Sequence, residues 1–319
     1  MIQFVSYPVP SSDGIHTLAG RVFLPAGYPE TPAVGIFHIV HGMIEHISRY
    51  DAFMQEVANT GWIVCGYDNL GHGDTVTDPS ERGYIAKKKG WDYLLRDVRV
   101  FSDDVRAKYG KDLPYVLMGH SMGSFIVRLA TERYVRPDGL IIMGTGGPNP
   151  AAGVGILLTR IIAAFKGDRH VSPLVESLSI GRFNERFGGT KNAPNPVAWM
   201  TDDDAVCQTF LSDEQCRFKF SVSAMGDLMR LLKDCNRSAW YQLMPKDLPI
   251  LLVAGDADPV GDYGKGVQTV YHRLQKAGAD VSCRMYPGMR HEILNSIGRD
   301  AVVEDLLSFL QSTAARKVD

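Results

Sequence analysis

Apolar residues in this chain fall into short unbroken runs, which alternate with longer segments where they recur every three or four positions. The runs have the length of strands, as in "WIVCGY" (62–67) and "GLIIM" (139–143). The segments between them, such as "WDYLLRDVRVFSDDVRAKYG" (91–110), have the spacing of an amphipathic helix and end at a glycine. This alternation predicts an α/β fold, with a mainly parallel sheet covered by helices on both faces.

The first 25 residues follow a different pattern. Two runs in which apolar and polar residues alternate, "IQFVSYPV" (2–9) and "HTLAGRVFLP" (16–25), flank the turn sequence "PSSDG" (10–14). Alternating runs on both sides of such a turn predict an antiparallel hairpin.

The alternation of strands and helices stops near residue 147 and resumes near residue 241. Between these points, over 148–240, the pattern is helical and rich in Met and Phe. We therefore predict one α/β core in two parts, 1–147 and 241–319, interrupted by an inserted helical cap at 148–240. An insertion that leaves the carboxyl edge of a parallel sheet lies over the usual ligand site, so the cap is a candidate lid.

Composition and charge narrow the class of protein. The 319 residues include 34 Lys and Arg against 36 Asp and Glu, a net charge of −2, so no nucleic acid partner is expected. The most apolar stretch, 153–165, contains Arg160 and is too short to cross a bilayer. The N-terminal sequence lacks the pattern of a secretory signal. Five cysteines without CxxC spacing favour reduced thiols, and we expect a cytoplasmic protein.

A candidate nucleophile lies between a predicted strand (115–118) and a predicted helix (122–133). Here Gly119, Ser121 and Gly123 form the pattern G-x-S-x-G. In this context the glycines permit a sharp turn that holds the serine hydroxyl above the sheet, at the positive N-terminus of the helix. The alternative interpretation is an ordinary loop serine between two turn glycines, which the pattern alone does not exclude.

The residues that could activate Ser121 lie in the second part of the core. A serine hydroxyl needs a histidine base oriented by a carboxylate, and in this architecture both follow the serine along the chain. One predicted strand is followed by Asp256 and Asp258, and the next by His291. We favour Asp258, because the chain has room there to turn the carboxylate towards His291. Asp256 and Asp262 remain alternatives.

An oxyanion hole requires two donors that face the ester carbonyl oxygen as it becomes negative. One predicted donor is the amide of Met122, which follows the candidate nucleophile. The loop "HIVHGMIEHISRY" (38–50) is expected to supply the other, because Gly42 frees the backbone and Met43 offers its N–H.

The same loop contains three histidines, His38, His41 and His46. They lack the order H-E-x-x-H and a carboxylate at helical spacing, so we predict no metal site, and we expect no cofactor. His41 is expected to brace the loop. His120, inside the G-x-S-x-G turn, is expected to be packed.

Five blocks, "HGMIEHISRY", "GYDNLGHGDT", "GHSMGS", "GDADPV" and "PGMRHEIL", resemble in order and spacing those of α/β-hydrolases similar to monoacylglycerol lipases and bacterial lysophospholipases. This group is also described as serine aminopeptidase-like. The resemblance covers the core and, more weakly, the cap. It implies a catalytic triad and two oxyanion donors, which are Ser121, Asp258, His291, Met43 and Met122.

The resemblance also assigns substrate contacts. Glu45 and Arg49 match loop positions that lie near the polar head group of the substrate in monoacylglycerol lipases. Two positions depart from the family pattern, because "GHSMGG" is here "GHSMGS" with Ser124 and "GHGxS" is here "GHGDT" with Thr75. Neither departure affects the triad.

These residues together predict a serine ester hydrolase that forms an acyl-enzyme. The expected substrate is an acyl ester with one fatty chain, such as a monoacylglycerol or a lysophospholipid. An aminopeptidase or amidase with the same triad remains an alternative, as does a non-catalytic ligand receptor on a hydrolase fold. The apolar stretch 153–165 has three open roles: lining an acyl pocket, packing on the core, and transient contact with a membrane surface. The oligomeric state is not predicted.

Overall fold

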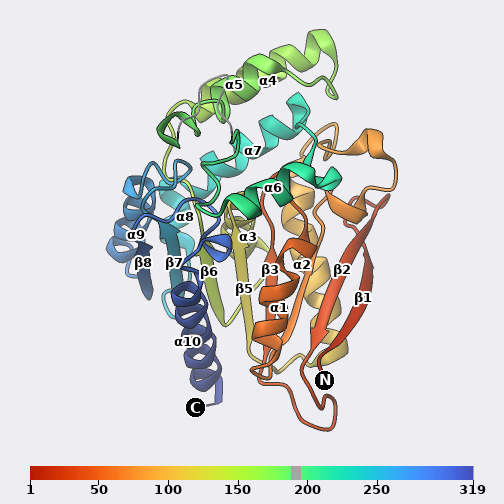
Figure 1. Ribbon diagram of the computed structural model, residues 1–319, viewed down its shortest axis with the longest axis vertical. Coiled ribbons are helices and arrows are strands. Elements are labelled where there is room, and N and C mark those ends of the chain that lie inside the picture. The colour runs from red at the N-terminus through yellow and green to blue at the C-terminus, as the bar shows by residue number, and fades with distance from the viewer. Residues whose placement is uncertain (188–194, 319) are drawn as a thin grey trace.

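The structure, a computed structural model, describes residues 1–187 and 195–318. At its centre lies an eight-stranded sheet (Figure 1). Its strands, in order across the sheet, are β1 (Gln3–Pro10), β2 (Thr17–Leu24), β4 (Ile63–Tyr67), β3 (Ile36–Val40), β5 (Tyr115–His120), β6 (Gly139–Met143), β7 (Ile250–Gly255) and β8 (Val281–Tyr286). All neighbours from β4 to β8 are parallel, while β2 pairs antiparallel with β1 and β4. The predicted parallel sheet and N-terminal hairpin are confirmed.

The burial of the strands explains their sequence pattern. Every residue of β3, β4, β5, β6 and β7 is buried, because helices cover both faces of the sheet there. Such strands are apolar throughout instead of alternating. The edge strands β1 and β8 alternate between exposed and more buried positions.

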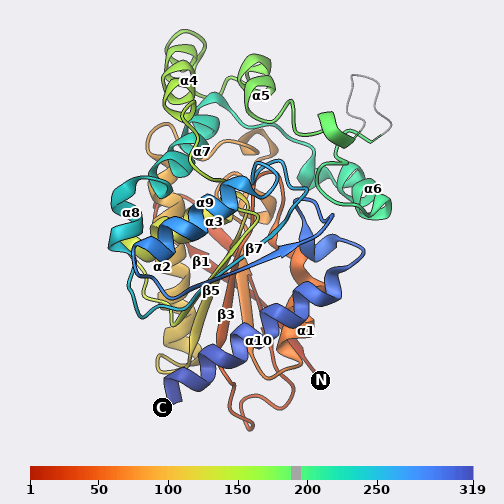
Figure 2. The same ribbon diagram turned by 90° about the vertical axis from the view of Figure 1, so that its left-hand side faces the viewer.

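Two layers of helices enclose the sheet (Figures 1 and 2). One face is covered by α1 (Asp51–Ala58) and α10 (Arg299–Val318), and the other by α2 (Gly90–Tyr109), α3 (Met122–Arg133) and α9 (Lys265–Lys276). Both ends of the chain lie at the same end of the molecule (Figure 1). Among the described residues, none of the helices combines the length and hydropathy needed to cross a bilayer.

Between β6 and β7 the chain forms the helices that we call the cap. They are α4 (Ala152–Lys166), α5 (Pro173–Ser179), α6 (Asp204–Ser212), α7 (Val222–Cys235) and α8 (Ser238–Leu243). α4 packs on α7, and α7 packs on α2 and α3 of the core. Most of these helices gather at the end of the molecule opposite the chain termini (Figure 1). The predicted α/β class with a helical insertion is confirmed. The boundaries at 148 and 240 stay a prediction, and residues 188–194 of the predicted cap lie outside the described residues.

Candidate active site

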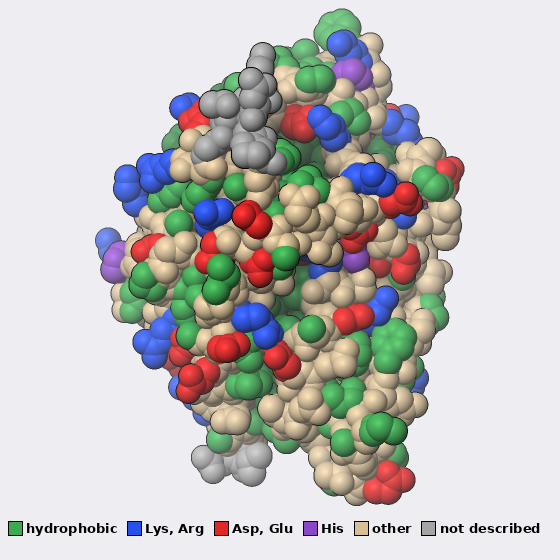
Figure 3. Space-filling model, in the orientation of Figure 1, with side chains coloured by type: hydrophobic (Ala, Val, Ile, Leu, Met, Phe, Trp, Pro, Cys, Tyr) green, Lys and Arg blue, Asp and Glu red, His purple; other side chains and the backbone are tan. Residues whose placement is uncertain are grey.

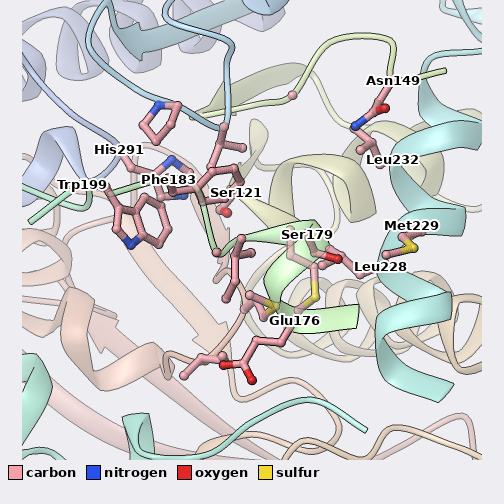
Figure 4. Close-up of a pocket in the computed structure, with 18 of the residues that line it drawn as sticks. Ser121, Asn149, Glu176, Ser179, Phe183, Trp199, Leu228, Met229, Leu232 and His291 are labelled. Carbon is pink, nitrogen blue, oxygen red and sulfur yellow. The ribbon is translucent and has the colours of Figure 1, made fainter. Parts of the chain in front are cut away.

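The carboxyl ends of the parallel strands and the cap enclose a cavity of about 1610 Å³. This exceeds the roughly 300–1,000 Å³ of an ordinary small-molecule site. Ser121 and His291 line it from the core, and Leu228, Met229 and Leu232 line it from α7 (Figure 4).

Ser121 lies on a strained turn between β5 and α3. Its φ of 54° and ψ of −119° fall outside the regions that L-residues prefer, at a cost of about 1–3 kcal/mol. The turn is held by its own N–H, which donates to Met143 O at 3.0 Å, and by the Ser124 hydroxyl, which donates to Ser121 O at 2.5 Å. A Cβ at Gly119 would lie 2.2 Å from Gly123 O, so this close turn needs glycine. The turn presents the serine to the cavity, and the unusual Ser124 takes part in holding it.

His291 is paired with one of the three candidate aspartates. Its Nδ1 lies 2.9 Å from Oδ2 of Asp258, and both side chains are buried. Oδ1 of Asp258 accepts the N–H of Val260 at 2.8 Å, which fixes the carboxylate. Asp256 is exposed and accepts the N–H of Gly288 at 2.7 Å. The third candidate, at position 262, is also exposed. The structure therefore brings Asp258 to the imidazole.

Ser121 and His291 come from different strand ends and face the same cavity (Figure 4). No hydrogen bond joins their side chains within the ranges that the structure describes. In a site without substrate this bond is often long, and it tightens when the substrate binds. The nucleophile and the base therefore share one pocket, and we expect their hydrogen bond to form when the substrate binds.

The two predicted oxyanion donors, Met43 and Met122, both line the cavity. Met122 begins α3, so its N–H has no acceptor within the helix. Neither amide donates to a protein acceptor within residues 1–187 and 195–318. A Cβ at Gly42 would lie 2.9 Å from the Cβ of Ser121, so glycine lets this loop approach the nucleophile closely. Free amides beside a serine suit the stabilisation of a developing oxyanion.

Glu45 lines the cavity, but its carboxylate is occupied by protein groups. Oε1 accepts the N–H of Gly42 at 2.5 Å and the hydroxyl of Tyr50 at 3.1 Å, and lies 3.0 Å from Nδ1 of His120. Burial alone would raise the pKa of Glu45, but the hydrogen bond and charge of His120 and the charge of Arg49 hold it well below its usual range. Burial lowers the pKa of His120, but Glu45 raises it above the ordinary value. Glu45 therefore stays charged and holds the loop beside Met43.

Arg49 is bound to two carboxylates. Its terminal nitrogens donate to both oxygens of Glu292 at 2.8 Å, and Nη1 also donates to Glu45 at 3.2 Å. The guanidinium lies 5.0 Å from the ring centre of Phe210 on α6. Such bidentate geometry is the strongest form of an ion pair between side chains. The head-group roles predicted for Glu45 and Arg49 stay predictions, because both side chains are engaged inside the protein.

Sequence reasoning did not find Glu292. Its position directly after the predicted base, in "RHEIL", was the available signal. The partner Arg49 lies 243 positions earlier, so no local pattern pairs them.

The three loop histidines point to three different partners. His38 bonds the hydroxyl of Tyr115 at 2.8 Å, and His46 bonds Asp213 of the cap at 2.7 Å. His41 donates to Gly42 O at 2.8 Å and accepts the N–H of Asn69 at 2.9 Å. Burial lowers the pKa of His41 to about 4, so it is neutral at pH 7. His41 thus contacts the loop that it was expected to brace.

A metal ion would find few suitable ligands in the described part of the chain. One group there, His46, Asp213 and Cys216, brings donor atoms within 4.8 Å of one another. The histidine and the aspartate of this group are already hydrogen-bonded to each other. It lies where the core loop meets the cap.

Comparison with known proteins places the chain in a family. Residues 31–297 match the family described as Serine aminopeptidase, S33. The chain is 26% identical to a monoacylglycerol lipase of Mycolicibacterium smegmatis over 95% of this chain and 99% of the relative. It is 24% identical to the monoglyceride lipase of Mus musculus over 87% and 82%. A carboxyl esterase from Bacillus coagulans, solved in complex with glycerol, has a TM-score of 0.89 and 28% identity, covering 98% of this chain and 99% of that one.

The matched range contains all the parallel strands, from β3 to β8, together with Ser121, Asp258 and His291. The family model covers most of the chain, and the fold agrees with that of the solved relative. The predicted resemblance is confirmed, and this chain belongs to the serine aminopeptidase S33 family of α/β-hydrolases.

Proposed function

We propose that this protein is a serine ester hydrolase that cleaves single-chain lipid esters, such as monoacylglycerols, through an acyl-enzyme. The observation that carries the proposal is the buried Asp258–His291 pair, whose histidine lines the same cavity as Ser121 on its strained turn. The names of the relatives, monoacylglycerol lipase and carboxyl esterase, support it.

In the proposed reaction, Oγ of Ser121 attacks the ester carbonyl carbon while Nε2 of His291 takes its proton. Asp258 holds the imidazole in the tautomer with Nδ1–H and stabilises the imidazolium. The amides of Met43 and Met122 donate to the oxyanion. His291 then protonates the leaving alcohol oxygen, which leaves the acyl group on Ser121. A water molecule that gives its proton to His291 attacks the acyl-enzyme, and His291 returns the proton to Oγ of Ser121 as the fatty acid leaves.

The cap side of the cavity suits an acyl chain. Leu228, Met229 and Leu232 of α7 and Leu158 of α4 contribute apolar side chains to the lining. The unbranched thioether of Met229 adapts to chains of different shape. A lysophospholipid would use the same chemistry with a different head group, so it remains a second substrate of the proposal.

The aminopeptidase alternative needs a free carboxylate to bind an ammonium group. The oxygens of Glu45 are taken by Gly42, Tyr50, His120 and Arg49. Glu45 therefore gives little support for an amine site, and we favour the ester reaction.

We also propose that the outer face of the cap touches lipid surfaces transiently. Leu157, Ile161 and Phe165 recur along one side of α4 and are 59%, 47% and 86% exposed. Leu174 and Leu178 of α5 are exposed as well. Figure 3 shows hydrophobic side chains around a hollow at this end of the molecule. An exposed apolar face on a helix beside a pocket for lipids suits docking on an interface.

The cytoplasm is the proposed compartment. All five cysteines are free thiols, and four of them are buried. A reducing environment keeps such thiols unpaired.

The experiment that tests the function compares fatty-acid release from a long-chain monoacylglycerol by the wild type and by Ser121→Ala. A lysophospholipid and an aminoacyl anilide are assayed beside it. Release from the monoacylglycerol that the variant loses supports the proposal. Turnover of the lysophospholipid alone keeps the mechanism and changes the head group. Turnover of the anilide alone overturns the ester assignment.

A further inference from the structure

Residues 198–202, which we call the strap, lie in the cap between the described residue 195 and α6. They are bonded to the loop that carries the proposed base. The side chain of Arg290 donates to Ala198 O at 2.5 Å and to Thr201 O at 2.8 Å. The N–H of Glu292 donates to Met200 O at 2.6 Å. The strap therefore holds the residues on both sides of His291.

Two more contacts extend this attachment beyond the histidine. The hydroxyl of Thr201 donates to Asn295 O at 2.7 Å. The carboxylate of Asp202 accepts the hydroxyl of Ser296 at 2.5 Å and the N–H of Ile297 at 3.2 Å. The strap thus follows the histidine loop from 290 to 297, although the two segments are about 90 positions apart in the sequence.

The strap also contacts the imidazole itself. The ring of Trp199 lies 5.2 Å from the ring of His291, centre to centre, at an angle of 35°. The ring of Phe183 packs against the indole of Trp199, with 5.1 Å between the ring centres. Figure 4 shows Trp199 and Phe183 close to His291 at the edge of the cavity. The core supplies a second ring contact, because His120 lies 4.8 Å from His291.

We propose that the strap positions His291. The packing of the cap against the core then controls the distance and orientation of the imidazole relative to Oγ of Ser121. This inference rests on the proposed function, in which His291 is the base. A productive site holds its groups within about 0.5 Å and 10–20° of the reacting geometry. His291 lies on a loop, and from the core the hydrogen bond of Asp258 orients only one edge of its ring. The indole of Trp199 and the ring of His120 together limit the remaining rotation of the imidazole, and only Trp199 belongs to the cap.

The proposal makes Trp199 a positioning residue. Trp199 also lines the cavity, but its proposed effect on the reaction passes through its contact with His291, and Arg290 acts in turn through the strap. Misplacement of a catalytic group by about 1 Å can cost about 10²-fold in rate. Because a poorly placed base slows proton transfer and leaves the substrate contacts intact, the loss should appear in kcat and not in KM.

The test uses the whole protein and a short acyl ester, 4-nitrophenyl acetate, because an acetyl group has far less apolar surface to bury in the cap lining than a fatty chain has. We expect Trp199→Leu to lower kcat by about 10- to 100-fold with little change in KM. Trp199→Phe should keep most of the wild-type kcat, since it retains a flat ring beside the imidazole. The matched control is Trp91→Leu, because Trp91 is also half-buried and stacks on Arg133 and Arg230, away from the cavity. Its kcat should stay at the wild-type value.

A second pair of variants loosens the strap without changing the indole. Arg290→Met removes the two bonds to Ala198 and Thr201 and should lower kcat about 10-fold, while Arg290→Lys should recover part of it. The double variant Trp199→Leu/Arg290→Met should lose less than the product of the two single losses, because both changes act through one segment.

The outcomes separate the two proposals. Wild-type kcat in Trp199→Leu, or a rise in KM alone, would overturn the positioning role and leave the ester hydrolase intact. Turnover that persists in Ser121→Ala would overturn the proposed function itself. If Trp199→Leu does not fold, as judged by its thermal melt, the kcat values of Trp199→Phe and Arg290→Met still test whether the strap positions His291. Wild-type kcat in Arg290→Met would then contradict the inference.

Discussion

On the core side of the cavity the groups assigned to the chemistry are buried polar side chains with fixed hydrogen bonds, whereas α4 and α7 line the cavity with apolar, partly exposed side chains. Asp258 and Glu45 each have two or more fixed partners in the core. Leu228 and Met229 contribute only van der Waals contacts to the lining. A developing charge needs donors that are already oriented, but an acyl chain needs only volume and apolar surface. The proposed chemistry and the proposed binding of the acyl chain therefore reside in different parts of the fold.

The largest effect should come from the nucleophile on the core side. Ser121→Ala should lower turnover of any ester about 10⁴-fold or more, because the acyl-enzyme no longer forms. Its melting temperature should equal that of the wild type. Ser121→Gly, equally inactive, should melt higher, since glycine adopts a φ of 54° without strain. Ester hydrolysis by either variant near the wild-type rate would contradict the assignment.

The oxyanion loop should be the next most sensitive region. In Gly42→Ala the new Cβ would lie 2.6 Å from Oε1 of Glu45 and 2.9 Å from the Cβ of Ser121, so the loop must move. We expect kcat to fall about 10²–10³-fold, the usual cost of a lost oxyanion donor. Gly153→Ala is the control, because a Cβ there meets only the Lys233 ammonium at 3.6 Å. Equal kcat in both variants would argue against a tight fit between the loop and the nucleophile.

Two buried carboxyl groups, Glu45 of the core and Asp227 of the cap, differ in the direction of their pKa shifts. Glu45 faces cations, whereas Asp227 of α7 faces only the backbone amides at the start of α2, and burial raises its pKa to about 7. A carboxyl group with a raised pKa in the folded protein lowers stability once the unfolded chain ionises, so this loss grows from about pH 4 to pH 7 and persists above. The unfolding free energy of Asp227→Asn relative to the wild type should therefore rise by about 4 kcal/mol between pH 4 and pH 8.

The measurement for Asp227→Asn is urea unfolding at several pH values. A difference between variant and wild type that stays constant with pH would show that Asp227 ionises freely in the folded protein.

The cap side should control the preference for chain length. Leu228→Trp fills part of the apolar cavity, and we expect kcat/KM for a long-chain monoacylglycerol to fall about 10-fold relative to that for 4-nitrophenyl acetate. Leu243→Trp is the control, because Leu243 is 60% exposed on α8. An equal loss on both substrates would mean that α7 supports the chemistry and not only the acyl chain.

The smallest effect should come from the outer face of α4. Leu157→Ser/Phe165→Ser should weaken binding to lipid vesicles about fivefold in a cosedimentation assay and leave hydrolysis of 4-nitrophenyl acetate unchanged. Ile15→Ser replaces another exposed apolar residue, in the turn between β1 and β2, and should bind as the wild type does. Unchanged binding of the double variant would remove α4 from the proposed docking face.

The features that could be predicted from the sequence have local signals. Unbroken apolar runs mark buried parallel strands, and the G-x-S-x-G turn needs only neighbouring residues to form its geometry. The choice of Asp258 over Asp256 followed from the room to turn beyond β7, and the hydrogen bond to His291 agrees with that choice.

The features that could not be predicted depend on contacts between distant segments. Arg49 matches a family position near the substrate head group, but the structure turns it towards Glu292, 243 positions later. The contact of Trp199 with His291 likewise joins the cap to the loop after β8. Neither segment has a local sequence pattern that predicts contact with the other. Electrostatic partners of this kind are set by the packing of whole elements.

The position of the chain ends has a practical consequence. Both ends lie at the end of the molecule opposite most of the cap helices (Figure 1). A fused domain, or a linker that anchors the protein to a solid support, can therefore be attached at either end without covering most of the cap helices. Immobilised in this way, the protein would present the cap and its apolar face to an emulsion.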